Sequence, residues 1–361
     1  MGRRTAAHPT DERREQESTA QEPGRSLAYG EPIAAPARGE IESFGLPGAE
    51  APTGVIRGLD GQIWFTSIGN HRLGRIDPAT GEVQTFSDPA GAVQLPANIY
   101  PSPADGRMWF TCLGSDRIGC IDPAAPDPVD SIQTFTAPGL VKPVAIKLAA
   151  DGRIWFSLRG ADALGAIDPT SKDPARSIEL FHSPVIDAPA AIFPAADDRL
   201  WWANSGSGTL GRLDPAAADP AATAERLSLP VAGAPRAWSD DREGRIWLTL
   251  QGPDALVCID PRAPDPEGSI VVIEASSLQR PDGIWRGDDG GIWFANTAAN
   301  SIGRIDPSAA DPRDSLETFG ARPDVDGPFD IKDGPDGWLW FTNKTGNTMG
   351  KIYAGASSVP A

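Results

Sequence analysis

The chain has 361 residues, with 49 acidic and 32 basic side chains, and its formal net charge is −17. A surface this negative repels phosphate backbones and anionic lipid headgroups, so we expect neither nucleic acid nor a membrane as a partner. No stretch approaches the roughly 18 apolar residues that a membrane helix needs, and the first residues lack the apolar core of a secretory signal. We therefore expect a cytoplasmic protein.

Residues 1–38 differ from the rest of the chain in composition. They carry six arginines, six acidic residues and almost no aromatic side chain, so the whole net charge belongs to residues 39–361. Such a segment cannot bury enough apolar surface to fold, and we expect a disordered polar tail. At the other end, residues 356–361 are expected to form a short C-terminal tail.

From residue 41 onward the chain repeats a short unit. A tryptophan flanked by apolar residues recurs seven times, at intervals of 45 to 47 residues, in segments such as QIWFTS (62–67) and GIWFAN (291–296). Each copy starts with a proline about a dozen residues earlier and continues into a second run such as LGRID (73–77) and a third such as LETF (316–319). The seven tryptophans are Trp64, Trp109, Trp155, Trp201, Trp247, Trp293 and Trp340.

These runs predict four short strands per copy. They are rich in β-branched and aromatic residues, are separated by Gly, Pro and Asp, and show no helical periodicity. A repeat of roughly 40 to 50 residues with four strands is typical of β-propeller blades, which bury their faces against neighbouring blades. The last copy lacks a fourth strand, and IESF (41–44) matches the run that ends the other copies. We therefore predict an all-β, seven-bladed propeller over residues 39–355, closed by this N-terminal strand.

Two further patterns indicate structure rather than chemistry. In copies two to six a motif such as DPAAPDP (122–128) follows the third strand. Its Asp residues can accept from free backbone N–H groups, and Pro suits the first position of a turn or a short helix, so we interpret the motif as structural. The odd number and the spacing of Cys112, Cys120 and Cys258 disfavour structural disulfides, and we expect reduced thiols that pack in the core.

The copies resemble those of the virginiamycin B lyase (streptogramin lyase) family. The segments DGQIWFTSIGNHRLGRID (60–77) and GGIWFANTAANSIGRID (290–306) carry the resemblance, which covers residues 41–353. It implies a propeller fold and an enzyme that opens the lactone ring of a cyclic depsipeptide antibiotic by elimination. In that mechanism a His removes the proton α to the ester carbonyl, while Mg²⁺ held near Glu residues polarises the carbonyl.

The catalytic residues that the resemblance implies are replaced in this chain. In the sixth copy Asp282 stands where the family has a His, and in the seventh Gly327 and Phe329 stand where it has a Glu and a His. The Glu expected three residues after the tryptophan is Asn296 in the sixth copy and Asn343 in the seventh. Without an imidazole base, we expect no streptogramin lyase activity by the family mechanism.

The resemblance places a functional site on the face that carries the start of each first strand and the turn after each tryptophan strand. Asp282 and Asp330 put two carboxylates on adjacent blades there, and we predict these, with Arg236, as the acid/base and orienting groups and His71 as a further candidate base. Such a polar set in a concave propeller centre favours a pocket for a small-molecule ligand. The predicted ligand-binding residues are Asn98, Lys142, Arg159, Asn204, Trp238, Gln251, Arg280, Asn296, Phe329, Asn343 and Lys344.

The sequence leaves several functions open for this pocket. The chain could be a lyase of secondary metabolism that opens, eliminates or cyclises a small ester or peptide-like metabolite, a metal-dependent lactonase-like hydrolase, or a non-catalytic propeller that binds a ligand or a protein. Oxygen atoms of Asp282, Asp330 and one Asn would suit Mg²⁺ or Ca²⁺. An Arg236–Asp282 pair would instead suit a carboxylate or amide ligand without a metal. We expect a monomer.

Overall fold

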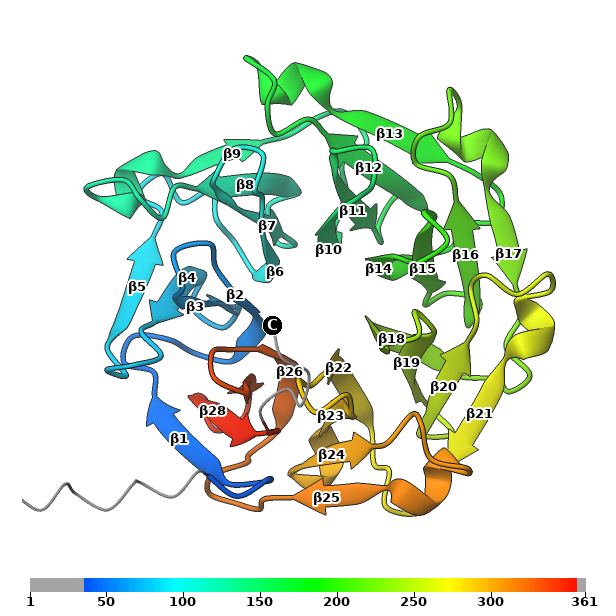
Figure 1. The fold of residues 1–361 in the computed structure, drawn as a ribbon. Coiled ribbons are helices and arrows are strands. Elements are labelled where there is room, and N and C mark those ends of the chain that lie inside the picture. The colour runs from blue at the N-terminus through cyan, green and yellow to red at the C-terminus, as the bar shows by residue number, and fades with distance from the viewer. Residues whose placement is uncertain (1–35, 356–361) are drawn as a thin grey trace, which may run out of the picture. The chain divides into compact units, whose positions relative to one another are not determined.

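Residues 36–355 form a ring of seven four-stranded sheets around a central channel (Figure 1). The computed structural model describes these residues, and the predicted tails therefore lie almost entirely outside the described part of the chain, which excludes residues 1–35 and 356–361. Among residues 36–355 no helix has the length and the hydropathy needed to cross a bilayer. The prediction of an all-β, seven-bladed propeller is confirmed.

Within each blade the strands are antiparallel, and the first strand after each proline lies next to the channel (Figure 1). We number the blades in chain order from β2. The innermost strands are β2 (Pro52–Arg57), β6 (Pro96–Pro101), β10 (Pro143–Leu148), β14 (Pro189–Pro194), β18 (Ala234–Asp240), β22 (Pro281–Arg286) and β26 (Pro328–Asp333). The second strands, which carry the tryptophans, are β3 (Ile63–Ser67), β7 (Met108–Cys112), β11 (Ile154–Leu158), β15 (Leu200–Asn204), β19 (Ile246–Gln251), β23 (Ile292–Asn296) and β27 (Trp338–Asn343).

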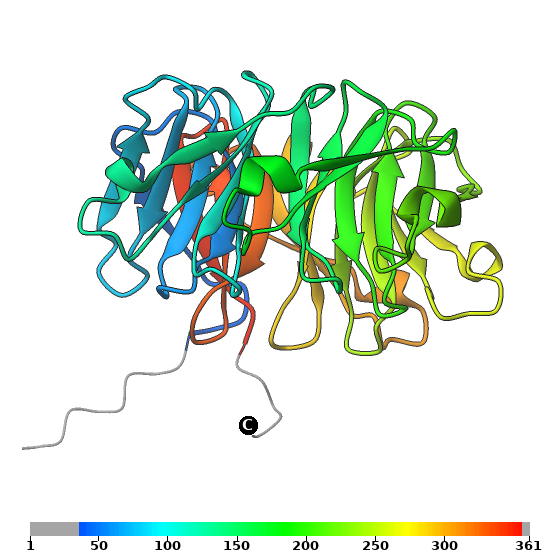
Figure 2. The ribbon, with the colours of Figure 1, turned by 90° about the horizontal axis from the view of Figure 1, so that it is seen from above.

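The third and fourth strands complete each blade toward the outside of the ring. Seen from the side, the strands run between two opposite ends, where the connecting turns gather (Figure 2). The third strands are β4 (Arg72–Ile76), β8 (Arg117–Ile121), β12 (Ala163–Ile167), β16 (Thr209–Leu213), β20 (Ala255–Ile259), β24 (Ser301–Ile305) and β28 (Thr348–Tyr353). The outermost strands are β5 (Val83–Ser87), β9 (Gln133–Phe135), β13 (Glu179–His182), β17 (Glu225–Leu227), β21 (Val271–Glu274), β25 (Glu317–Phe319) and β1 (Ile41–Gly45).

The seventh blade is completed by a strand from the other end of the sequence. β1 pairs antiparallel with β28, and Ile41 lies opposite Ile352. A side-chain contact adds to this closure, because the Thr342 hydroxyl donates to the carbonyl oxygen of Thr53 at 2.7 Å and so joins the last blade to the first. The predicted closure by residues 41–44 is confirmed.

The core lies between the blades, where the tryptophans of the second strands are buried. Trp155, for example, is fully buried and packs in one cluster with Ile192 and Leu200 of the next blade. Burying a large aromatic side chain contributes about 1.5–3 kcal/mol relative to leaving it exposed. The repeated tryptophan thus supplies each contact between neighbouring blades with a large apolar group.

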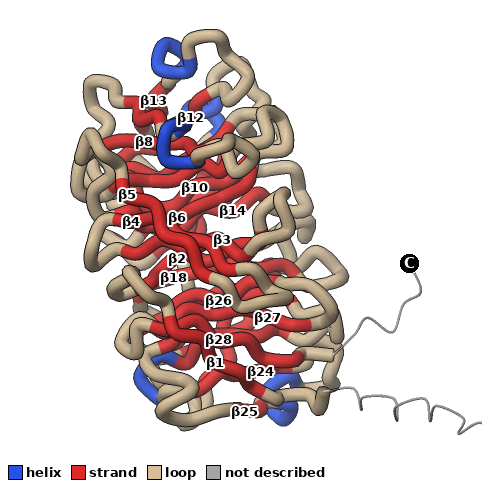
Figure 3. Tube along the Cα trace, turned by 90° about the vertical axis from the view of Figure 1, so that its left-hand side faces the viewer, coloured by secondary structure: helices blue, strands red, loops and turns tan. Residues whose placement is uncertain are grey.

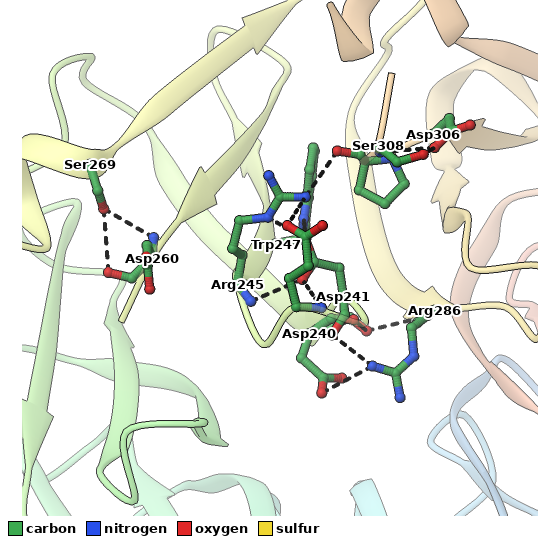
Figure 4. A network of polar contacts seen from close by, with 12 residues as sticks. Asp240, Asp241, Arg245, Trp247, Asp260, Ser269, Arg286, Asp306 and Ser308 are labelled. Carbon is green, nitrogen blue, oxygen red and sulfur yellow. Dashed lines mark hydrogen bonds and ion pairs between the residues drawn. The ribbon is translucent and has the colours of Figure 1, made fainter. Parts of the chain in front are cut away.

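The turn between the first and second strands also repeats. In blades one to four and in blade six the indole N–H donates to an aspartate four residues earlier, as Trp155 does to Asp151 at 3.0 Å. In blade five the indole donates to Asp241, which also accepts from Arg245 (Figure 4). The indole N–H of Trp340 in blade seven has no hydrogen-bond partner within the described residues.

The helices are short 3-10 segments, and most of them lie at the outer rim (Figure 3). In the motifs that precede them, aspartates accept from backbone N–H groups, as Asp122 does from Ala124 at 2.9 Å and Asp127 from Val129 at 3.0 Å. The structural interpretation of these motifs is confirmed, and the three cysteines are free and buried, as predicted. The segments are η1 (Pro128–Ser131), η2 (Pro174–Ser177), η3 (Pro220–Thr223), η4 (Glu267–Ser269), η5 (Thr297–Ala299) and η6 (Pro312–Ser315).

Candidate functional site

The candidate site lies where the innermost strands begin. In every blade the pairing between the first and second strands shifts just after the proline, as it does between Pro281 and Ile284 in blade six. Such a bulge bends the strand and re-aims its side chains. Two consecutive residues of each blade consequently line the channel. They are Thr53 and Gly54, Ala97 and Asn98, Val144 and Ala145, Ala190 and Ala191, Arg236 and Ala237, Asp282 and Gly283, and Phe329 and Asp330.

A cavity of about 370 Å³ opens at this end of the channel, on the face that the resemblance implied. Its walls differ in character. Blades one to four contribute mostly apolar or small side chains, including Ile68, Leu113, Val144, Ala190 and Ile192. Blades five to seven contribute most of the charged side chains, namely Arg236, Arg280, Asp282, Asp330, Lys332 and Lys344, and blade three adds Lys147 and Arg159. The cavity is therefore amphipathic.

The structure brings most of the predicted site residues together in this cavity. Gln251 lies directly behind it, where its Nε2 donates to Oδ2 of Asp282 at 3.2 Å. The predicted residues that line the cavity are Asn98, Arg159, Arg236, Trp238, Arg280, Asp282, Phe329, Asp330 and Lys344.

Three predicted asparagines lie outside the cavity lining. Asn204, Asn296 and Asn343 end the second strands of blades four, six and seven, and all three are fully buried. Each side chain turns back to hold the loop before the innermost strand. In blade six, the Asn296 side chain accepts from the backbone N–H of Gln279 at 2.7 Å and donates to the carbonyl oxygen of Ser277 at 2.8 Å. The structure thus uses these amides for local hydrogen bonds.

His71 and Lys142 also lie outside the cavity lining. Both are exposed and have left-handed backbone conformations, with φ of 62° and 50°. Nδ1 of His71 accepts from the backbone N–H of Leu95 at 3.0 Å, and the backbone N–H of Lys142 donates to the Asp116 carboxylate at 2.7 Å. These contacts place both residues in turns at the rim.

Two lysines of the cavity were missed by the sequence analysis. Lys147 and Lys332 stand four residues after the prolines of β10 and β26 and lie deep in the cavity. Nζ of Lys332 is 2.6 Å from a carboxylate oxygen of Asp330 and 4.9 Å from the ring centroid of Trp285. Nζ of Lys147 is 4.4 Å from the ring centroid of Tyr100 and 5.9 Å from that of Trp285, which belongs to a blade on the other side of the ring. The signal that could have identified both residues is a lysine within an innermost strand, which the repeat pattern predicts to be buried.

Burial changes the acidity of several cavity groups. It lowers the pKa of the Lys147 ammonium to about 7, and the neighbouring charge of Lys332 lowers this pKa further. Burial also lowers the pKa of Lys344, whereas the nearby negative charge of Asp282 acts to raise it. For the Asp282 carboxyl, burial raises the pKa, and the guanidinium of Arg236 acts against that rise. All three shifts have the direction expected when charged groups lose contact with water.

A model of the virginiamycin B lyase family matches residues 33–263, more than half of the chain. The chain belongs to the virginiamycin B lyase family. No curated protein sequence matches it.

Several solved structures have the same fold. A streptogramin B lyase matches with a TM-score of 0.72 and 24% identity, over 87% of this chain and 97% of that one. A catalytically inactive virginiamycin B lyase from Staphylococcus aureus with quinupristin matches with a TM-score of 0.72 and 21% identity, over 87% of this chain and 99% of that one. The hydrazine synthase of Kuenenia stuttgartiensis has a TM-score of 0.69 and 14% identity, over 85% and 97% of the two chains. At these identities the likeness shows the fold alone.

The carboxylates of this family member are held by its own side chains. Asp282 and Asp330 come close because residue 283 is a glycine. A Cβ at this position would collide with the backbone of Asp330. Oδ2 of Asp282 lies 3.5 Å from Nη2 of Arg236 and accepts from Gln251, and Asp330 is paired with Lys332. Each carboxylate thus already has a cationic neighbour.

The donor set does not suit the divalent cation that the family implies. Among residues 36–355 no group of three or more His, Cys, Asp or Glu is arranged to hold a metal ion. Mg²⁺ and Ca²⁺ need several oxygen ligands, whereas Oδ2 of Asp282 and Oδ1 of Asp330 are already engaged by basic or amide groups. The basic side chains of the cavity would also repel a cation.

Three buried polar atoms in the cavity lining have no hydrogen-bond partner within the described residues. They are Oδ1 of Asn98, Nε of Arg236 and Nε1 of Trp238. Trp238 is only 5% exposed, and it occupies a position where the other six blades have Val or Ile. Leaving a buried polar group unpaired costs about 1–3 kcal/mol. The residues that line the cavity therefore include hydrogen-bonding groups that the described part of the protein leaves unsatisfied.

Proposed function

We propose that this chain binds a small ester or peptide-like metabolite in the cavity at the end of its channel. The observation that carries the proposal is an amphipathic cavity of about 370 Å³ with unpartnered polar atoms in its lining, among the described residues. A mostly apolar pocket with a few placed polar groups is typical of small-molecule sites. The catalytically inactive virginiamycin B lyase from Staphylococcus aureus adds support, because that protein was solved with quinupristin.

A blocked-cavity variant tests this proposal. N-Acetylphenylalanine methyl ester and quinupristin serve as probes in calorimetry and thermal-shift measurements. Ala191 lines the cavity, so Ala191→Trp should fill it and abolish saturable binding. Ala216 is exposed in an outer motif, and Ala216→Trp should leave binding unchanged. Binding of either probe that survives Ala191→Trp would refute the cavity as the binding site.

A second candidate function is ring opening or elimination of the bound metabolite, and the environment of Asp282 favours it. Burial raises the pKa of this carboxyl, and a base whose pKa approaches the working pH is more effective in proton transfer. Arg236 and Asp330 would orient the substrate. The family mechanism itself is disfavoured, since general-base catalysis contributes about 10²–10⁴-fold and Asp282 and Phe329 replace the two implied His residues.

Mass spectrometry of quinupristin incubated with the chain and Mg²⁺ tests catalysis. We expect no linear product at a rate comparable to that of a true lyase. Efficient conversion to a linear dehydro product would show that another group, such as Asp282 or His71, acts as the base. Adding Mg²⁺, Ca²⁺ or EDTA should leave the melting temperature unchanged, whereas a metal-dependent shift that Asp282→Ala abolishes would support a metal-dependent enzyme.

A further inference from the structure

The cavity is basic although the protein is strongly acidic. The net charge of the chain is −17, yet the described residues that line the cavity include six basic and two acidic side chains. Chance placement of charge would give an acidic lining instead. The excess of positive charge therefore points to the charge of the ligand.

The basic groups of the cavity are poorly neutralised by the protein. Within the described part of the chain, the ion pairs of the lining are Arg236–Asp282, at a long 3.5 Å, and Lys332–Asp330 at 2.6 Å. Arg159, Arg280 and Lys344 form no ion pair with any described residue, and Nζ of Lys344 rests 4.5 Å from the ring centroid of Phe329. Their charges remain available to a ligand.

Some basic residues on the outside of the blades are neutralised more completely. Arg304 contacts Asp289 at 2.7 Å and Glu317 at 3.4 Å, and Arg153 likewise pairs with Asp151 and Glu179. These outer arginines stack on the tryptophans of the second strands and serve the blade itself. Among the described residues, the cavity arginines Arg159 and Arg280 have no acidic partner, and Arg236 has only Asp282 at 3.5 Å.

Two unpartnered donors come from one strand. Arg236 and Trp238 both belong to β18 and line the cavity, and Nε of the guanidinium and Nε1 of the indole lack an acceptor within residues 36–355. Both groups can only donate hydrogen bonds, so the missing partner must be an acceptor. A carboxylate offers two acceptor oxygens and matches the fork of an arginine. Asp282 does not fill this role, because it contacts only Nη2 and at 3.5 Å.

We infer that the ligand carries a carboxylate, bound by Arg236 and the indole N–H of Trp238 and attracted by the unpaired charge of Arg280, while its apolar part lies against blades one to four. This inference rests on the proposed function and names its ligand class, which is amphipathic acids such as N-acylated amino acids. The apolar wall that receives the remainder of the molecule includes Val144, Ala190 and Ile192.

Three probes that differ at one group test the inference. N-Acetylphenylalanine, its methyl ester and its amide share an apolar body, and only the acid carries a charge. At equal ionic strength, calorimetry should show that the acid binds at least tenfold more tightly than the ester and the amide. Acetate should bind at least tenfold more weakly than the acid, because it lacks the apolar part.

Variants of the two donors locate the carboxylate. Arg236→Gln should weaken binding of the acid at least tenfold and leave binding of the ester nearly unchanged. Trp238→Phe keeps the aromatic ring without the N–H and should weaken binding of the acid about fivefold. Arg176→Gln is the control for charge, because this side chain is exposed in η2 and makes only a local pair with Asp173. Melting temperatures verify that each variant is folded.

The outcomes separate this inference from the proposal on which it rests. Equal binding of acid and ester, or loss of acid binding in Arg176→Gln, would overturn the carboxylate and leave the pocket as a binding site. Acetate binding as tightly as the acid would also overturn the amphipathic ligand class. If neither the ester nor the acid binds, the proposed function falls together with the inference.

Discussion

The two ends of the blades differ in how faithfully they repeat. At the end with the turns between first and second strands, an aspartate accepts from the tryptophan indole in six of the seven blades among the described residues. At the opposite end, the two residues after each bulge change from blade to blade, from Ala190 and Ala191 to Asp282 and Gly283. At one end nearly all blades therefore share the same hydrogen bond between an aspartate and the indole, whereas at the other end the side chains differ between blades.

This difference follows from what each end has to do. Every blade needs the same contact with its neighbour, so the same side chains serve in each copy. A ligand is not seven-fold symmetric, and a pocket for it requires different groups in different blades. We consequently expect residues of the repeating end to stabilise the fold, and residues of the cavity to contribute little stability or to reduce it.

The largest effect should come from breaking the ring at β1. A chain without residues 1–46 loses the pairing of β1 with β28 and the stacking of Phe44 on Trp340, whose ring centroids are 5.3 Å apart. It also exposes the edge of β28. We expect the cooperative thermal unfolding transition to be lost, as followed by calorimetry. The reference is a chain without residues 1–35, and identical unfolding of the two chains would show that β1 does not close the ring.

The next effect concerns two adjacent aspartates at the repeating end. Asp241 is 2% exposed and accepts from Arg245 at 2.7 Å and from Trp247 at 2.9 Å (Figure 4). Asp241→Ala leaves these donors without an acceptor and should lower the free energy of unfolding by about 3 kcal/mol. Asp240 makes only a half-exposed pair with Arg286, so Asp240→Ala should cost less than about 1 kcal/mol. Urea denaturation measures both, and equal losses would contradict the comparison.

Lys147 provides a test at the other end of the blades. The pKa of Lys147 is lowered to about 7 in the folded chain. At pH values between about 7 and the ordinary lysine pKa, Lys147 is therefore protonated in the unfolded chain but mostly neutral in the folded chain. The lowered pKa reduces the free energy of unfolding most below pH 7, and this reduction becomes smaller as the pH rises toward the ordinary lysine pKa. Relative to Lys147→Met, the free energy of unfolding should rise by about 3 kcal/mol between pH 7 and pH 9.5.

Urea denaturation at several pH values measures this difference, and the titrating groups that do not interact with Lys147 cancel in the comparison with the variant. At pH 7 the Lys147→Met chain should be the more stable of the two, as expected for a residue kept for the cavity rather than for the fold. A constant difference across this pH range would contradict the lowered pKa.

The smallest effect concerns the backbone at the rim. Arg280 and Lys142 both precede the proline of an innermost strand with left-handed φ angles of 53° and 50°, and blade seven has Gly327 at this place with φ of 62°. Glycine adopts this conformation without strain, so Arg280→Gly and Lys142→Gly should each raise the free energy of unfolding by about 0.5 kcal/mol. Only Arg280→Gly should weaken binding of N-acetylphenylalanine, by about fivefold. Equal effects of the two variants on binding would remove Arg280 from the site.

The fold could be predicted because its signal is repeated. Seven tryptophans at nearly constant spacing define the blades, and the match of residues 41–44 to the other outer strands defines the closure. The face of the site followed from the family resemblance. Because the pattern repeats, the predictions of the blades and of the closure do not depend on any single side chain.

Side-chain direction was less predictable, since it depends on contacts between segments distant in the sequence. Asn296 stands next to the cavity face, but its amide bonds the loop before β22. Lys147 and Lys332 lie in strands that the pattern marks as buried, and they enter the cavity only because seven innermost strands meet around one channel. The direction of these side chains cannot be predicted from the sequence of a single copy of the repeat.

The pairing of β1 with β28 sets an order on the assembly of the chain. Ile41 is among the first propeller residues to leave the ribosome, and its partner Ile352 is among the last. Blades one to six each consist of contiguous residues and can form during synthesis, whereas the seventh cannot close until β28 has been made. Until then β1 has no neighbour in its sheet. The nascent chain thus carries an open strand edge while the rest of the propeller is synthesised, which is the interval in which a chaperone would be most useful to it.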